Sequence, residues 1–178
     1  WSGASKPEPV AARAAPLPFS RPPRQFGAME KLRPRFWETV PLKKMNSAEW
    51  EALCDGCGKC CLNKIEYEDT GEVDYTRIAC RLLDGQTCRC SHYEIRHQFV
   101  PDCVRLTPAS LPKIAYWMPR TCAYRLLWEG APLPDWHPLV TGDPESTHAA
   151  GQSVRGWTVP EFEVDEDDWE DYVIEEKP

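Results

Sequence analysis

Apolar residues recur at helical spacing in residues 118–130, MPRTCAYRLLWEG. This pattern predicts a helix with Pro119 in its first turn and Gly130 at its end. Cys122 falls in that expected first turn, where a thiolate would be stabilised and could act as a ligand or as a reactive thiol. The apolar residues on one face are Tyr124, Leu127 and Trp128.

A second, shorter helix is predicted over residues 46–53, NSAEWEAL. Asn46 can cap its N-terminus, and Glu49 three residues later completes a capping-box pattern. The helix would lead the chain directly into Cys54.

Alternation of apolar and polar residues predicts strands in residues 64–78, KIEYEDTGEVDYTRI. The Asp69–Gly71 segment in its middle is typical of a turn, so the two halves should form a β-hairpin. Residues 133–145, LPDWHPLVTGDPE, are rich in turn-forming residues and predict a loop.

The two ends of the chain differ from its middle in composition. Residues 1–35 are rich in proline and arginine and lack apolar periodicity, which predicts a disordered extension. Residues 161–178 form an acidic C-terminal tail, of a kind that is usually solvated. Residues 36–160 therefore remain as the expected folded domain of this 178-residue chain.

The charge pattern restricts the expected partners. The net charge is −7, and residues 161–178 contain ten acidic residues and one lysine. Nucleic acid is not expected as the partner, because phosphate binding needs a basic surface. No secretory signal or membrane-spanning apolar run is readable, which predicts a reducing, cytoplasmic location without membrane contact. A protein partner of unknown identity is compatible with the sequence.

Cysteine changes this picture most. All nine cysteines fall within residues 54–122, a density typical of a disulfide or metal scaffold. In a reducing compartment, and with an odd number of thiols, metal ligation is the better interpretation. The candidate metal ligands are Cys54, Cys57, Cys60, Cys61, Cys80, Cys88, Cys90, Cys103 and Cys122.

The segment CDGCGKCC, residues 54–61, carries the strongest signal. A C-x2-C-x2-C run can supply three ligands of an iron–sulfur cubane, with the fourth from elsewhere in the chain. Four thiolates equally suit a tetrahedral zinc site. Gly56 and Gly58 permit positive φ and let backbone N–H groups approach sulfur.

The adjacent pair Cys60 and Cys61 suggests more than one centre. Successive side chains on an extended backbone point to opposite sides, so these two thiols would serve neighbouring sites. Two four-thiolate sites would use eight of the nine cysteines. A thiolate-bridged zinc cluster is a further alternative, which the Cys88-x-Cys90 spacing suits.

Other interpretations of single residues remain. Cys103 and Cys122 could each be small buried apolar residues. His92 could be a ligand or a hydrogen-bonded surface residue, and a structural loop role is expected for His137. No nucleotide-binding or metalloprotease motif is present.

The cysteine-bearing blocks together resemble a known family. EWEALCDGCGKCC, EDTGEVDYTRIAC, TCRCSHYEIR, PDCVRLTP and MPRTCAYRLLWEG are similar, in this order, to blocks of the YcgN-type bacterial proteins. These proteins belong to the YkgJ-like CxxCxxCC group, described as zinc- or iron-chelating. The resemblance covers residues 36–160, places every cysteine in a matching block, and implies metal binding but no particular activity.

The sequence therefore predicts a small, irregular α+β domain, with short helices and a β-hairpin, that is stabilised by metal. The expected cofactor is an iron–sulfur cluster, slightly preferred, or Zn²⁺. No recognised enzymatic activity is expected. The alternative is a cluster-dependent redox protein or an enzyme that modifies protein side chains.

Overall fold

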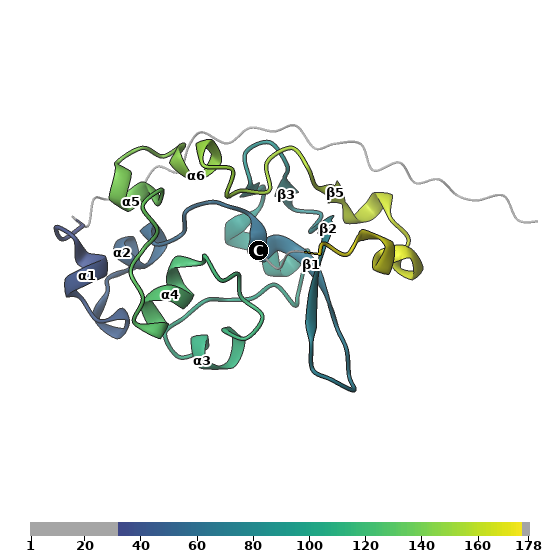
Figure 1. Ribbon diagram of the computed structural model, residues 1–178, viewed down its shortest axis with the longest axis horizontal. Helices are drawn as coiled ribbons and strands as arrows, with labels where there is room; N and C mark the ends of the chain where they lie inside the picture. The colour runs from purple at the N-terminus through teal and green to yellow at the C-terminus, as the bar shows by residue number, and fades with distance from the viewer. Residues whose placement is uncertain (1–31, 176–178) are drawn as a thin grey trace, which may run out of the picture.

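A computed structural model describes residues 32–175, and the predicted disordered extension lies almost entirely outside these residues. The chain forms short helices and a few strands, as expected for a small α+β fold (Figure 1). The α-helices are α1 (Phe36–Thr39), α2 (Ser47–Ala52), α3 (Leu111–Ile114), α4 (Ala123–Glu129), α5 (Pro138–Thr141) and α6 (Ser146–Ala149). The strands are β1 (Leu62–Glu66), β2 (Val73–Ala79), β3 (Leu83–Asp84), β4 (Arg89–Cys90) and β5 (Val159–Pro160). The 3-10 helices are η1 (Leu42–Lys44), η2 (Lys59–Cys61), η3 (Tyr93–Gln98), η4 (Glu161–Glu163) and η5 (Glu166–Tyr172).

Helix α2 begins where the sequence predicts. The Asn46 side chain accepts a hydrogen bond from the Glu49 N–H at 2.8 Å, and the Glu49 carboxylate accepts one from the Asn46 N–H at 3.1 Å. This reciprocal pair is a capping box, which satisfies two backbone donors at the start of the helix. The predicted helix is therefore confirmed, and it delivers the chain to Cys54.

The predicted hairpin is also present. Strands β1 and β2 pair antiparallel, with Glu66 opposite Val73 and Leu62 opposite Ala79. Gly71, at a φ of 69°, closes the turn through its N–H bond to the Tyr67 carbonyl. Strand β5 adds to the other edge of β2 in parallel, and a separate two-stranded sheet, β3 with β4, was not predicted.

Helix α4 is shorter than the sequence predicts. It starts at Ala123 rather than near Pro119, with Cys122 in the N-cap position in an extended conformation. The expectation that Pro119 and Cys122 belong to the first turn is therefore wrong. The Cys122 N–H bonds to the Pro119 carbonyl in a separate turn that precedes the helix. Gly130 ends the helix in the left-handed conformation, at a φ of 78°, as predicted.

The expected loop at residues 133–145 contains helix α5, and α6 follows it directly. The His137 side chain caps α5 by accepting a hydrogen bond from the Leu139 N–H at 3.1 Å. Composition predicts a loop here and not a helix, because α5 has only four residues and depends on the His137 side-chain cap.

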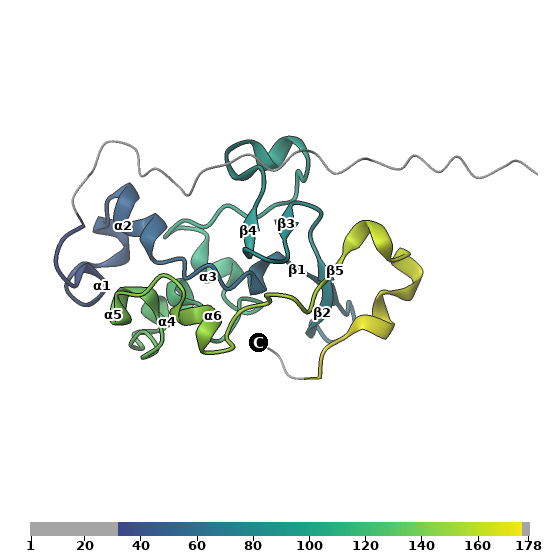
Figure 2. The same ribbon diagram turned by 90° about the horizontal axis from the view of Figure 1, so that it is seen from above.

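Two apolar clusters make up the core. The first lies among α1–α4 and consists of Phe36, Leu53, Leu111, Met118, Ala123, Tyr124 and Leu133. The second lies beside the hairpin and consists of Leu62, Tyr75, Ala79, Cys88 and Val154. Figures 1 and 2 show the helices α1–α6 on one side of the molecule, the C-terminal 3-10 helices on the other, and the strands between them.

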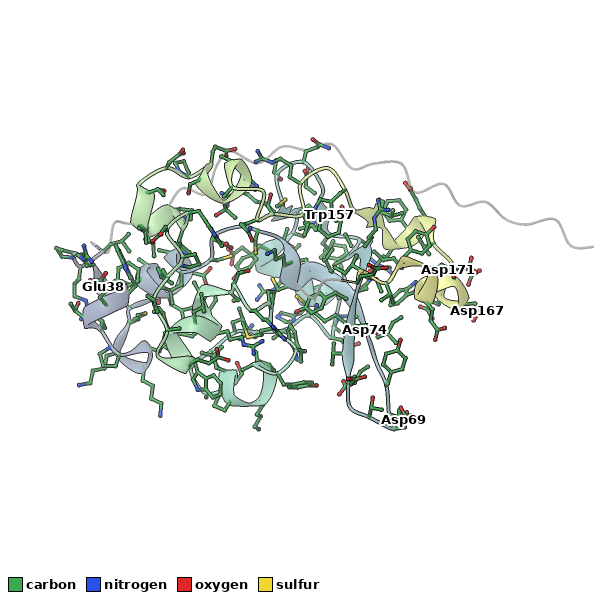
Figure 3. All side chains as sticks on the ribbon, viewed as in Figure 1. Glu38, Asp69, Asp74, Trp157, Asp167 and Asp171 are labelled. Atoms are coloured by element: carbon green, nitrogen blue, oxygen red, sulfur yellow. The ribbon has the colours of Figure 1, made fainter. Side chains whose placement is uncertain are left out.

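The acidic segment, residues 161–175, returns to the hairpin. The Ile174 N–H bonds to the Tyr75 carbonyl at 2.8 Å, and Val173 forms a β-bridge with Thr76. Its carboxylates stay largely exposed, and Figure 3 shows Asp167 and Asp171 at the outer end of the molecule. Within residues 32–175, no helix has the length and apolar character needed to cross a membrane.

Candidate metal centre

The loop from Cys54 to Cys61 joins the two apolar clusters, because Leu53 belongs to the first and Leu62 to the second. It turns at Gly56 and Gly58, whose φ angles are 73° and 76°. The Asp55 carboxylate accepts the Cys57 N–H at 3.0 Å, and the Gly58 carbonyl accepts the Cys61 N–H at 3.0 Å. The loop is thus tightly folded by its own backbone, as the two glycines predicted.

Cys60 and Cys61 do not diverge. Residues 59–61 form the 3-10 helix η2, and the two sulfur atoms lie 4.0 Å apart in hydrogen-bond contact. This hydrogen bond lowers the pKa of Cys60 and raises that of Cys61. The prediction that the two side chains point to opposite sides is wrong, because it assumed an extended backbone.

We give the name group I to Cys54, Cys57, Cys60 and Cys122, because the charges of Cys54 and Cys60 act on both Cys57 and Cys122. The Lys59 ammonium donates to the Thr121 hydroxyl at 3.2 Å, which ties the cysteine loop to the residue before Cys122. Burial raises the pKa of Cys122 to about 12, and the nearby charges of Cys60 and Cys54 add to the shift. Burial also raises the pKa of Cys57, and Cys60 and Cys54 again contribute.

We give the name group II to Cys61, Cys80, Cys90 and Cys103, because Cys80 acts on Cys61, and Cys103 and Cys90 act on Cys80, although Cys54 of group I also acts on Cys61. The Cys80 N–H donates to the Cys61 carbonyl at 2.9 Å. Cys90 faces Leu83 across the β3–β4 pair, and the Leu83 N–H bonds to the Cys80 carbonyl. Burial raises the pKa of Cys80, and the charges of Cys103 and Cys90 contribute to the increase. Cys61 joins the two groups through its contact with Cys60.

Backbone N–H groups are directed at sulfur in both groups. The N–H of the residue two positions on lowers the pKa of Cys57, Cys80 and Cys122 by hydrogen bonding, although burial raises each of them overall. The donors are Lys59, Leu82 and Tyr124, and at Cys122 the N–H of Arg125, three positions on, contributes more than that of Tyr124. Such N–H···S bonds stabilise thiolates and tune metal–thiolate centres.

Cys88 stands apart from both groups. It is buried in the hairpin cluster at a φ of 53°, and it packs against Gly58. Burial raises its pKa, and the polar groups that act on it are Arg155, Ser153, the Val154 backbone and Asp84. Its environment is that of a core residue.

The histidines have other roles. His137 is fully buried, and both of its ring nitrogens are engaged, by the Leu53 carbonyl and the Leu139 N–H, which confirms its structural role. His92 bonds to Ser91, and His148 bonds to Ser153. The buried Nε2 of His97 has no hydrogen-bond partner among residues 32–175, and no motif or spacing in the sequence identifies His97 as a ligand.

The side chains that could hold a metal are thiols, which are the ligands of zinc–thiolate and iron–sulfur centres. Figure 3 shows most of the sulfur atoms, in yellow, in the middle of the molecule. Across the described part of the chain, no three Cys, His, Asp or Glu side chains converge closely enough to hold one ion. In a cubane each thiolate binds a different iron, so its ligands need not converge as they do around a single zinc ion.

A cavity of about 310 Å³ has walls that include Tyr75, Trp117, Arg120 and Arg125, and none of the residues that line it is a cysteine. Burial raises the pKa of Tyr75, and the charges of Cys60 and Cys122 contribute to the increase. Tyr75 is thus the wall residue whose pKa responds to the thiols of group I.

The sequence profile of the CxxCxxCC family, described as a "putative zinc- or iron-chelating domain", matches residues 53–123. A UPF0260 protein of Rhodobacter capsulatus is 72% identical over 145 residues, covering 82% of this chain and 97% of that protein. UPF0260 proteins of Rhizorhabdus wittichii and Rhizobium etli are 66% and 60% identical, covering 72% and 79% of this chain and 88% of each relative. No solved structure matches the chain.

Proposed function

Because the chain belongs to the UPF0260 family, we propose that it acts as a metal-binding protein in which thiolates hold an iron–sulfur cluster. The proposed ligands of the first centre are the group I cysteines. The group II cysteines would hold a second centre, and Cys88 would hold none.

The approach of Cys122 to the C-x2-C-x2-C loop carries this proposal. A cubane takes three ligands from such a loop and a fourth from a distant part of the chain. Cys122 meets this requirement, since the hydrogen bond from Lys59 to Thr121 brings its segment to the loop. Burial raises the pKa of Cys57 and Cys122, so a bound metal would have to displace their protons, and the N–H donors at both sulfur atoms would then stabilise the thiolates.

Zinc is the second candidate, and the Cys60–Cys61 contact favours it. With zinc–sulfur bonds of about 2.3 Å, two ligands of a tetrahedral site lie about 3.8 Å apart. The observed sulfur separation of 4.0 Å is close to that distance. These two thiols could therefore share an ion without a large rearrangement.

Metal analysis of anaerobically purified protein tests the proposal. We expect iron and acid-labile sulfide in the wild-type chain, less of both in Cys122→Ser, and wild-type amounts in the control Cys88→Ser. Colourless protein that contains only zinc would refute the iron–sulfur assignment. Metal-free protein with nine titratable thiols would refute metal binding itself.

A further inference from the structure

Two lysines flank the Cys60–Cys61 pair, and both hold their ammonium groups against uncharged partners. Lys59 is only 7% exposed. Its Nζ donates to the Thr121 hydroxyl at 3.2 Å and to the Gln152 side-chain carbonyl at 3.3 Å. Both acceptors are neutral.

Lys64 is partly buried on the other side of the pair. Its Nζ donates to the carbonyls of Cys60 and Leu62, at 3.1 and 2.6 Å. The same ammonium lies 4.7 Å from the ring centroid of Tyr75 and 4.9 Å from that of Trp117, in cation–π geometry. These partners orient the charge but do not neutralise it.

Within residues 32–175, neither lysine forms an ion pair with a carboxylate. A buried charge without a counter-charge is costly, so buried charges in proteins are normally paired with an opposite charge. Cys60 and Cys61 are close enough to Lys64 for their charges to act on it. Lys59 directly precedes Cys60.

A four-thiolate centre supplies the missing negative charge. Four thiolates around one Zn²⁺ leave a net charge of about −2, and a cubane core that carries the same positive charge leaves the same excess. Cys60 is exposed and Cys61 half-buried, so water screens this excess only in part, and nearby positive charge would offset the rest.

We propose that Lys59 and Lys64 are the counter-charges of the metal centre at Cys60 and Cys61. Both act as positioning residues: they bind no metal, but they stabilise the anionic metal–thiolate group and hold the backbone that carries it. This inference rests on the proposed function, since it requires a bound metal.

The test compares the release of metal from four variants of the full chain into excess chelator. Lys59→Met and Lys64→Met remove the charge with little change in volume, and Lys64→Gln removes the charge but keeps an N–H donor. Lys113→Met is the control, because Lys113 is exposed and distant from the cysteines in sequence. We expect release about tenfold faster from the first three, as is typical for lost outer-shell partners, and unchanged release from the control.

The glutamine variant separates charge from hydrogen bonding. Fast release from both Lys64→Gln and Lys64→Met supports a role for the charge. Wild-type release from Lys64→Gln would show that only the hydrogen bonds matter and would overturn the proposal. For an iron–sulfur centre, the midpoint potential should also become more negative in the charge-removing variants, which a purely structural role would not cause.

The outcomes distinguish the two proposals. A wild-type chain without metal overturns the proposed function. A wild-type chain that binds metal, together with lysine variants that release it at the wild-type rate, overturns only the role of the lysines.

Discussion

At the scale of single residues, Glu49 is the buried acid whose hydrogen bonds hold the first turn of α2, the helix that precedes Cys54. Its carboxylate is fully buried and accepts hydrogen bonds from Asn46 and from the backbone and guanidinium of Arg33, the closest at 2.5 Å. The Arg33 guanidinium lowers the pKa of Glu49 to about 2, although burial opposes the shift. This network fixes the start of the helix that leads into Cys54.

We expect Glu49→Gln to lower the free energy of unfolding by about 1–3 kcal/mol at pH 7, because charge-assisted hydrogen bonds are lost. Since folding lowers this pKa, the carboxylate stabilises the fold fully above pH 4.5, and the effect declines as the pH falls towards 2. The difference between wild type and variant in urea unfolding should therefore be smaller at pH 4 than at pH 7. An equal difference at both pH values would contradict the account.

Glu38→Gln is the matched control for this measurement. Glu38 pairs with Arg35 at the surface, where water screens an ion pair and leaves it little effect on stability. If Glu38→Gln lowered the free energy of unfolding more than Glu49→Gln does, burial of the carboxylate would not determine how much each ion pair stabilises the fold.

Sequence reasoning at this scale succeeded where a residue acts on its near neighbours. The hydrogen bonds between Asn46 and Glu49 could be predicted from the capping-box pattern alone. The directions of the Cys60 and Cys61 side chains could not be predicted, because these residues lie in η2 and not in an extended segment. The Cys88-x-Cys90 spacing suggests that the two thiols share a site. Cys88 instead packs against Gly58, a tertiary contact that the spacing does not predict.

At the scale of elements, the cysteine loop depends on Gly58. A Cβ atom at this position would lie 2.7 Å from the Val154 Cγ2 and 3.3 Å from the Cys88 Cβ. The glycine therefore provides both a positive φ and the space into which the hairpin cluster packs. This close contact also explains why Cys88 is buried.

We expect Gly58→Ala to destabilise the protein by about 1–3 kcal/mol more than Gly142→Ala, because only the first substitution overpacks the core. Both glycines have a φ of 76°, but a Cβ at Gly142 meets no atom within 4 Å. Both variants therefore place alanine at the same unfavourable positive φ. The difference between their thermal unfolding temperatures measures the cost of overpacking at Gly58. Equal destabilisation would mean that the contact with Val154 is unimportant.

The hairpin and the cap of α2 could be predicted because their patterns are local. The β3–β4 pair and helix α5 could not, since each is very short and depends on distant contacts. The start of α4 was misplaced because proline is compatible with a first turn, whereas here it closes a separate turn before the helix.

At the scale of the whole molecule, the two apolar clusters are small and the cysteine loop connects them. No described α-helix is longer than seven residues, which is too short to be stable alone. Both thiol groups draw on segments that are far apart in sequence, so a bound metal would join the helical side to the hairpin side. The central claim is that this link completes the fold.

Removal of the metal tests this claim directly. Structural metal sites contribute roughly 10 kcal/mol of apparent binding free energy, more than a small core provides. We expect chelator-stripped protein, with metal loss verified by elemental analysis, to lose its near-UV circular dichroism, and Cys57→Ser to show the same loss. A fully stripped sample that kept its near-UV spectrum and its cooperative thermal transition would contradict the account.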